Sequence, residues 1–240
     1  YIRKQTLVNS EQYITPELKE YEEKILSAEE KIEAIELHIF NELCLDILKQ
    51  AAILQENASV LNRLDVLANF GQVAKANKYI RPTLDNKSVL KIKGGRHPVV
   101  EQLLPATERF IPNDLIMNTR NNQIHLITGP NMAGKSTYLR QIGLIVLMAQ
   151  VGSFVPVFTA NIGLVDKLFT RVGASDNLAG GESTFLVEMN EAANILNNAT
   201  ENSLILLDEI GRGTATYDGL SLAWAITEHL HNNELVAART

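Results

Sequence analysis

The sequence has 240 residues, of which 45% are hydrophobic and 21% charged, and its formal net charge is −6. This composition is ordinary for one large domain or one domain with an appendage, and the net acidity argues against a basic nucleic-acid-binding module. Cys44 is the single cysteine, which excludes an internal disulfide and favours a reducing compartment, so we expect a cytoplasmic protein. The apolar stretches are interrupted before they reach membrane-spanning length.

The first third of the chain is predicted to be helical from Pro16 to Ala76. Thr15 suits the N-cap position before Pro16. Apolar residues then recur at alternating spacings of three and four, as in a coiled-coil seam, at Leu18, Tyr21, Ile25, Ala28, Ile32, Ile35 and Ile39. We place a turn at Asn57–Ser59, so that two helices pack as an antiparallel hairpin. Such a hairpin transmits motion as a lever or merely covers the next domain, and composition alone favours the cover.

The hydrophobic period changes at Arg81–Thr83, where Pro82 ends the helix. Leu90–Lys93 alternates with a period of two, as a strand does. We therefore place a domain boundary near residue 80, with a helical segment at residues 1–80 and an α/β domain at residues 81–240. Short strands and loops are expected up to residue 123.

The clearest chemical motif is Gly129–Ser136, which fits the phosphate-binding pattern G-x-x-x-x-G-K-[ST]. A strand is predicted before it, at Ile124–Thr128, and a helix after it, at Ser136–Val151. This strand–loop–helix context separates a real phosphate loop from a Gly-rich turn with an incidental lysine.

The residue types of the loop follow from the task of holding phosphates. Gly129 and Gly134 permit a tight turn and a close approach of the backbone. The amide N–H groups and the start of the helix then attract an anion. Lys135 supplies a positive charge for the β- and γ-phosphates, and Ser136 offers a hydroxyl to Mg²⁺.

A second motif begins with the apolar run Ser203–Leu207, which predicts a buried parallel strand. Asp208 and Glu209 follow where the strand emerges, at the edge of an open α/β sheet that binds ligands. We expect Asp208 to hold Mg²⁺ through water, and Glu209 to orient and deprotonate the water that attacks the γ-phosphate. The two motifs together predict a P-loop ATPase.

The segments between and after the motifs carry weaker signals. Ile162–Val172 is predicted to be a strand with an embedded turn, and Gly173–Gly181 a flexible loop. Ser183 then begins a helix, where it serves as an N-cap or presents its hydroxyl to an anion. A polar loop at Gly211–Gly219 leads into a helix at Ser221–His231.

Four stretches together resemble the ATPase domain of the MutS DNA mismatch repair family. They are Gly129–Thr137, Thr170–Asp176, Ser183–Met189 and Asp208–Thr214. Tyr1–Leu7 and Thr15–Tyr21 also resemble bacterial members of this family, so the resemblance covers essentially the whole chain. It implies an ABC-type P-loop fold, with a mixed or parallel sheet and flanking helices after a helical lever hairpin.

The resemblance also implies a site that binds ATP or ADP with Mg²⁺. The implied nucleotide-binding residues are Gly129, Pro130, Asn131, Met132, Ala133, Gly134, Lys135, Ser136, Thr137 and the adenine-stacking Phe110. The implied metal ligands are Ser136 and Asp208. The implied catalytic residues are Glu209, Lys135 and Ser183, the last acting as an ABC-type signature serine on the nucleotide of another copy. Arg212, Thr214 and Asp218 would lie in the loop between the two nucleotide sites.

For the whole protein, the resemblance implies a homodimer in which residues 16–80 link ATP-driven closure to DNA-bound domains. The implied partners are mismatched duplex DNA, contacted through regions outside this chain, and the downstream repair factor MutL. The chain starts without Met and stops at Thr240, before the family's His-containing switch motif, so we expect it to be part of a longer protein. Two alternatives are a module that binds nucleotide without hydrolysing it, and a related protein outside mismatch repair.

Overall fold

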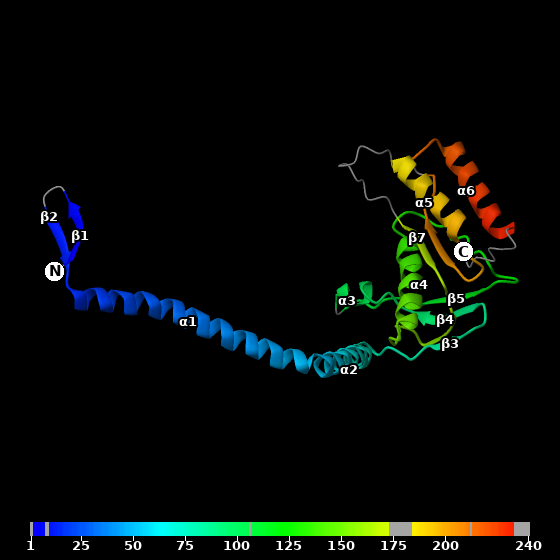
Figure 1. Cartoon of the computed structure of the whole chain (residues 1–240). Coiled ribbons are helices and arrows are strands. Elements are labelled where there is room, and N and C mark those ends of the chain that lie inside the picture. The colour runs from blue at the N-terminus through cyan, green and yellow to red at the C-terminus, as the bar shows by residue number, and fades with distance from the viewer. Residues whose placement is uncertain (1, 8–9, 106, 173–183, 212, 233–240) are drawn as a thin grey trace. The chain divides into compact units, whose positions relative to one another are not determined.

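The structure is a computed structural model that describes residues 2–7, 10–105, 107–172, 184–211 and 213–232 (Figure 1). The chain divides into two compact units, Tyr1–Val66 and Leu67–Thr240. This division by packing lies within α2 and does not test the domain boundary that the sequence predicts near residue 80, which stays a prediction. No helix in the described part of the chain is both long and apolar enough to cross a membrane.

The first unit begins with a two-stranded antiparallel hairpin, β1 (Ile2–Leu7) and β2 (Ser10–Ile14). Helix α1 (Pro16–Lys49) follows, and α2 (Ala51–Asn77) begins in this unit. The predicted helix start is confirmed, because the Thr15 hydroxyl accepts a hydrogen bond of 3.1 Å from the Leu18 amide.

The predicted turn at Asn57–Ser59 is wrong, because α2 runs straight through it. The break lies instead at Gln50, whose backbone (φ −100°, ψ 2°) ends α1. No Gly or Pro follows Pro16 until Gly71, so nothing in the sequence between these positions forces a turn. No residue of α1 is buried, and its seam residues, such as Tyr21 and Ile25, are 63% exposed. The described residues therefore do not form the expected packed hairpin.

The second unit is mixed α/β. A mixed four-stranded sheet has the order β3 (Thr83–Asp85), β6 (Thr159–Gly163), β4 (Val89–Gly95), β5 (Asn113–Asn118). Strands β7 (Leu168–Val172) and β8 (Leu204–Asp208) form a separate parallel pair. The helices are the short α3 (Val100–Leu103), α4 (Lys135–Gln150), α5 (Thr184–Asn198) and α6 (Thr216–Asn232). Helix α6 begins before the predicted Ser221, because residues 216–220 already form its first turn.

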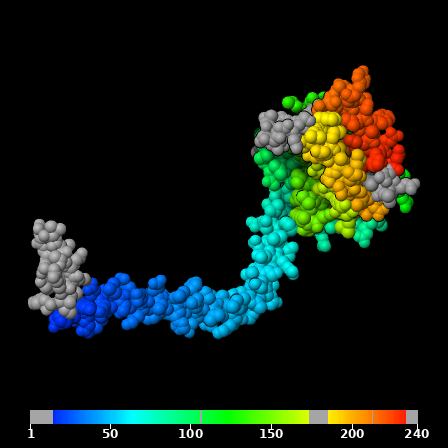
Figure 2. All heavy atoms as spheres, turned by 45° about the horizontal axis from the view of Figure 1, so that its top comes forward, coloured from blue at the N-terminus to red at the C-terminus, as the bar shows by residue number. Residues whose placement is uncertain are grey.

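Two hydrophobic clusters meet at β8. Leu204 and Leu206 belong to the cluster that α4 forms with the four-stranded sheet. Ile205 belongs to the second cluster, together with residues of α5 and α6 such as Ile195 and Ile226. Strand side chains alternate between faces, so each face of β8 packs into a different cluster. Helices α5 and α6 lie side by side on the surface of this unit (Figure 2).

The predicted strand at Ile124–Thr128 is wrong. These residues are described, but they form no strand pairing. Alternating apolar residues make a strand only where a neighbouring edge accepts their hydrogen bonds. Here residues 124–127 and Leu204–Leu207 of β8 line the same pocket of about 290 Å³. Leu126 is 83% exposed, so the segment reaches the phosphate loop as irregular chain.

Candidate nucleotide site

The phosphate loop turns through left-handed backbone before α4 begins. Gly134 is the residue that precedes the helix, and its φ of +88° suits glycine because a Cβ disfavours that region. Met132 also has a positive φ, +63°, and its side chain is fully exposed. The loop thus delivers the first turn of α4, with its free N–H groups, to the surface.

Lys135 is held at the mouth of this turn. Its Nζ donates to the carbonyl oxygens of Gly129 at 2.8 Å and Pro130 at 2.9 Å. An ammonium group has three protons to donate, so one donor direction is left for an anion. The predicted placement of the positive charge at the helix start fits this geometry.

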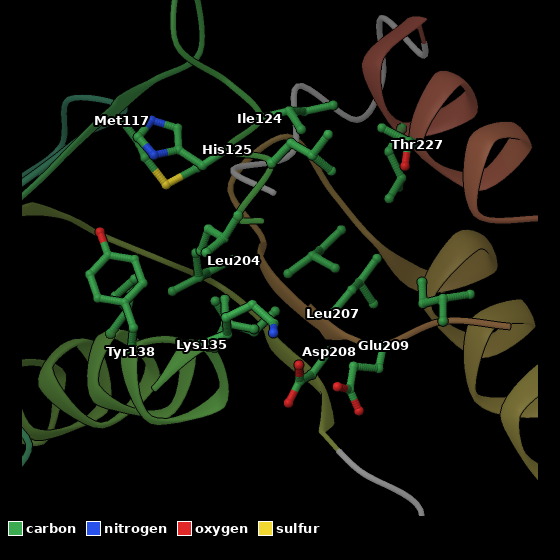
Figure 3. Close-up of a pocket in the computed structure, with 18 of the residues that line it drawn as sticks. Met117, Ile124, His125, Lys135, Tyr138, Leu204, Leu207, Asp208, Glu209 and Thr227 are labelled. Atoms are coloured by element: carbon green, nitrogen blue, oxygen red, sulfur yellow. The ribbon is translucent and has the colours of Figure 1, made fainter. Parts of the chain in front are cut away.

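Asp208 and Glu209 stand at the carboxyl end of β8. Asp208 is 6% exposed. A regular strand would send Glu209 to the opposite face, but its φ of +58° turns the chain. The two carboxylates lie side by side, and the Lys135 side chain is directed toward them (Figure 3).

One pocket of about 360 Å³ collects residues from both motifs. It is lined by Asn131, Met132, Gly134, Lys135, Ser136, Thr137 and Glu209. Asp208 lines the neighbouring apolar pocket together with Lys135. The phosphate loop and the end of β8, which are far apart in the sequence, thus bring the Lys135 ammonium group close to the two acids.

The metal-binding prediction rests on oxygen donors. No cluster of three or more His, Cys, Asp or Glu side chains suited to a metal occurs among the described residues. The Ser136 hydroxyl and the Asp208 carboxylate are the donors that Mg²⁺ prefers, since Mg²⁺ commonly takes one or two protein oxygens and fills its shell with phosphates and water. These two residues fit the ion.

The other predicted site residues fall in different places. Phe110 is partly buried ahead of β5 and is not among the residues that line the phosphate-loop pocket. Thr214 precedes α6 and Asp218 lies in its first turn. Ser183 and Arg212 lie outside the described residues.

Comparison with known proteins decides the family. Residues 125–239 match the family model of MutS domain V, and residues 1–31 match MutS family domain IV. Over all 240 residues the chain is 65% identical to the DNA mismatch repair protein MutS of Salinibacter ruber and 59% identical to that of Parabacteroides distasonis. The chain belongs to the MutS family. It spans about a quarter of the length of these relatives, 26% and 28% respectively.

A third relative, MutS of Chlorobium chlorochromatii, is 60% identical over 230 residues, which cover 96% of this chain and 26% of that protein. The MutS domain V match contains the phosphate loop and Asp208–Glu209, whereas Phe110 lies outside both matched ranges. The convergent site therefore belongs to MutS domain V.

The sequence motifs assign no role to Glu188, although it lies in Ser183–Met189, one of the stretches that resemble the MutS family. Glu188 is 2% exposed, and it touches both Arg171 and the backbone after Glu209. One signal was present: Glu188 precedes Ala192 and Ile195 at helical spacing, on the face of α5 that is buried.

Two further side chains near α4 have shifted pKa values. Burial, followed by the charge of Arg140, lowers the pKa of His97 below its usual value. Its neutral Nδ1 accepts from the amides of Val99 at 3.3 Å and Val100 at 3.2 Å. Burial, followed by the charge of Asp114, raises the pKa of Tyr138, whose hydroxyl donates to the Asp114 carbonyl at 3.0 Å. Both groups stay neutral at physiological pH and act as packing and hydrogen-bonding residues.

Proposed function

We propose that this chain is the ATP-binding portion of a mismatch repair protein, with an ABC-type P-loop fold and Mg²⁺-dependent hydrolysis. The observation that carries the proposal is the single pocket that Lys135, Ser136 and Glu209 line together. The name of its relatives, DNA mismatch repair protein MutS, supports mismatch repair as the process.

The proposed chemistry assigns one task to each group. The loop amides and Lys135 bind the phosphates and offset their charge. Ser136 and Asp208 would hold Mg²⁺, and the bound ion would supply positive charge beside the phosphate oxygens. Glu209 orients a water molecule and accepts its proton as the water oxygen attacks the γ-phosphorus, while the bond from that phosphorus to the β–γ bridging oxygen breaks and ADP leaves with the bridging oxygen. Phe110 is proposed to stack on adenine.

The proposal for the whole protein is a homodimer whose nucleotide sites are completed by Ser183 of a second copy. Residues 1–80 would act as a lever that carries closure of the ATPase part, residues 81–240, to domains that bind mismatched duplex DNA. MutL is the proposed downstream partner.

The deciding experiment compares Lys135→Ala and Glu209→Gln in the full-length polypeptide that carries this sequence. We expect Lys135→Ala to lose ATP binding, measured with a fluorescent ATP analogue. Glu209→Gln should keep binding while its turnover falls by about 10²- to 10⁴-fold, the usual contribution of a general base. Lys91→Ala, which changes an exposed lysine on β4, is the matched control and should behave as wild type.

The outcomes separate the alternatives. Wild-type turnover in both variants would refute the site assignment. A wild-type protein that binds ATP but shows no turnover, with or without mismatched DNA, would favour a binding module. Turnover without any preference for mismatched over matched DNA would favour a related protein outside mismatch repair.

A further inference from the structure

The second unit holds a buried acid that the proposed chemistry does not use. Glu188, on α5, is 2% exposed, and glutamate is rarely buried to this degree unless it is paired. Its Oε1 accepts a hydrogen bond from the backbone N–H of Gly211. Its Oε2 lies 3.9 Å from Nη2 of Arg171. Oε1 is thus paired with the Gly211 amide and Oε2 with the Arg171 guanidinium.

The cation in this network comes from β7. Arg171 is 7% exposed and stands opposite Leu207 of β8 in the parallel register. Its Nε also lies 2.8 Å from Oε2 of Glu191, as an ion pair whose geometry is not that of a hydrogen bond. The Glu191 side chain is 49% exposed. One cation therefore faces two carboxylates, and only the buried one reaches the backbone after β8.

The Gly211 amide that Glu188 holds belongs to a tightly fixed turn. A Cβ on Gly211 would lie 2.5 Å from Cα of Gly219, so the turn is pressed against the start of α6. A Cβ on Gly213 would lie 3.0 Å from Cα of Phe185, on the first turn of α5. The turn begins at Glu209, whose left-handed backbone sets the direction of its carboxylate.

We propose that Glu188 is a positioning residue for Glu209: its carboxylate holds the Gly211 amide and thereby fixes the turn that aims Glu209 into the phosphate-loop pocket. The inference rests on the proposed ATPase function. A purely structural ion pair is the competing explanation, but buried pairs add little net stability on average, and Arg171 has a second, more exposed carboxylate partner. The bond to Gly211 links this network to the turn that carries Glu209.

The test uses Glu188→Gln and Glu188→Ala in the full-length polypeptide, with Glu191→Gln as the matched control. Gln keeps an acceptor for the Gly211 amide but loses the charge, whereas Ala loses both. We expect kcat for ATP to fall by about 3- to 10-fold in Glu188→Gln, as a charge-assisted bond becomes neutral. It should fall by about 10²-fold in Glu188→Ala, the cost of slight misplacement of a reacting group. The Kd for ATP should change by less than about 2-fold, because phosphate binding is left intact.

Glu191→Gln removes the exposed partner of Arg171 and should leave kcat and Kd at wild-type values. Turnover of Glu188→Gln equal to that of wild type, while Glu209→Gln is inactive, would overturn this inference and leave the proposed function standing. A parallel loss of kcat, ATP affinity and Tm in Glu188→Gln would also overturn it, because the residue would then serve folding. Absence of turnover in wild type would overturn both together. If Glu188→Ala does not fold, the Gln variant alone decides.

Discussion

Two backbone positions decide where Glu209 points. Glu209 and Gly211 both have left-handed φ values, +58° and +86°. For a residue with a Cβ this conformation costs about 1–2 kcal/mol. Glu209 adopts it at the position where the backbone sets the direction of the proposed catalytic carboxylate. The motif predicts which acid stands at the site, but its backbone conformation depends on contacts with α5 and α6 that lie elsewhere in the chain.

Gly211→Ala should destabilise the protein more than Gly152→Ala. Both glycines have nearly the same φ, +86° and +89°. An added Cβ meets the Gly219 backbone at the first position and nothing within 4 Å at the second. We expect about 1–2 kcal/mol for Gly152→Ala from backbone strain alone, and about 1–3 kcal/mol more for Gly211→Ala from overpacking. Urea unfolding midpoints measure the difference, and equal losses would contradict the contact with Gly219.

Among the elements, β8 does the most to position the site. Its apolar run predicted a buried strand, and the alternation that places Leu206 in one cluster and Ile205 in the other follows from strand geometry. Helix α4 and the phosphate loop were predicted for the same reason: their local pattern is strong. The strand predicted at Ile124–Thr128 is wrong, since strand pairing depends on a neighbouring edge that sequence periodicity does not reveal.

The predicted helical hairpin, with its turn at Asn57–Ser59, is wrong for a related reason. Asn57 and Ser59 are common in turns, yet they are tolerated in an exposed helix at a small cost each. Glu188 escaped prediction because its partners, Arg171 and Gly211, lie on other elements. Local chemistry thus points to Lys135 and Glu209 as candidate site residues, whereas the contacts of the turn after Glu209 depend on tertiary packing.

Leu206→Ala should show the weight of β8 in the packing. Leu206, a residue of β8 in the cluster with α4, is 4% exposed, whereas Leu147 on the outer side of α4 is 51% exposed. We expect a loss of about 2–5 kcal/mol for Leu206→Ala and less than about 1 kcal/mol for Leu147→Ala. Chemical denaturation followed by circular dichroism measures both, and similar losses would show that the α4–β8 contact is not a core contact.

At the scale of the molecule, the two units differ in how their helices are stabilised. Helix α4 buries six residues in the second unit, whereas α1 buries none in the first. In proteins, most of the stability of a helix comes from the packing of its apolar face rather than from its own propensity. The cap at Thr15 adds about 1 kcal/mol, and an exposed pair such as Glu20–Lys24, whose atoms lie 2.7 Å apart, adds about 0.2–0.5 kcal/mol.

Hydrogen exchange of the 240-residue chain should therefore separate the two helices. We expect amides of α1 to exchange at least about 10²-fold faster than those at Ile142–Val146 of α4, because local opening of α1 breaks no buried contacts. Peptide-resolved mass spectrometry measures both in one sample. Equal protection of α1 and α4 would mean that α1 is covered in solution.

Because β8 contributes to both hydrophobic clusters, its position also bears on whether the site or the fold is lost first. Each face of this strand is anchored in a different cluster, and the two acids stand at its free end. Loosening either cluster releases one face of the strand and shifts its tip, while the other cluster still holds the chain together. We therefore expect heat, denaturant or a core substitution to reduce the proposed ATP turnover before the secondary structure is lost, so that turnover would report a loosened cluster earlier than a spectroscopic signal of secondary structure.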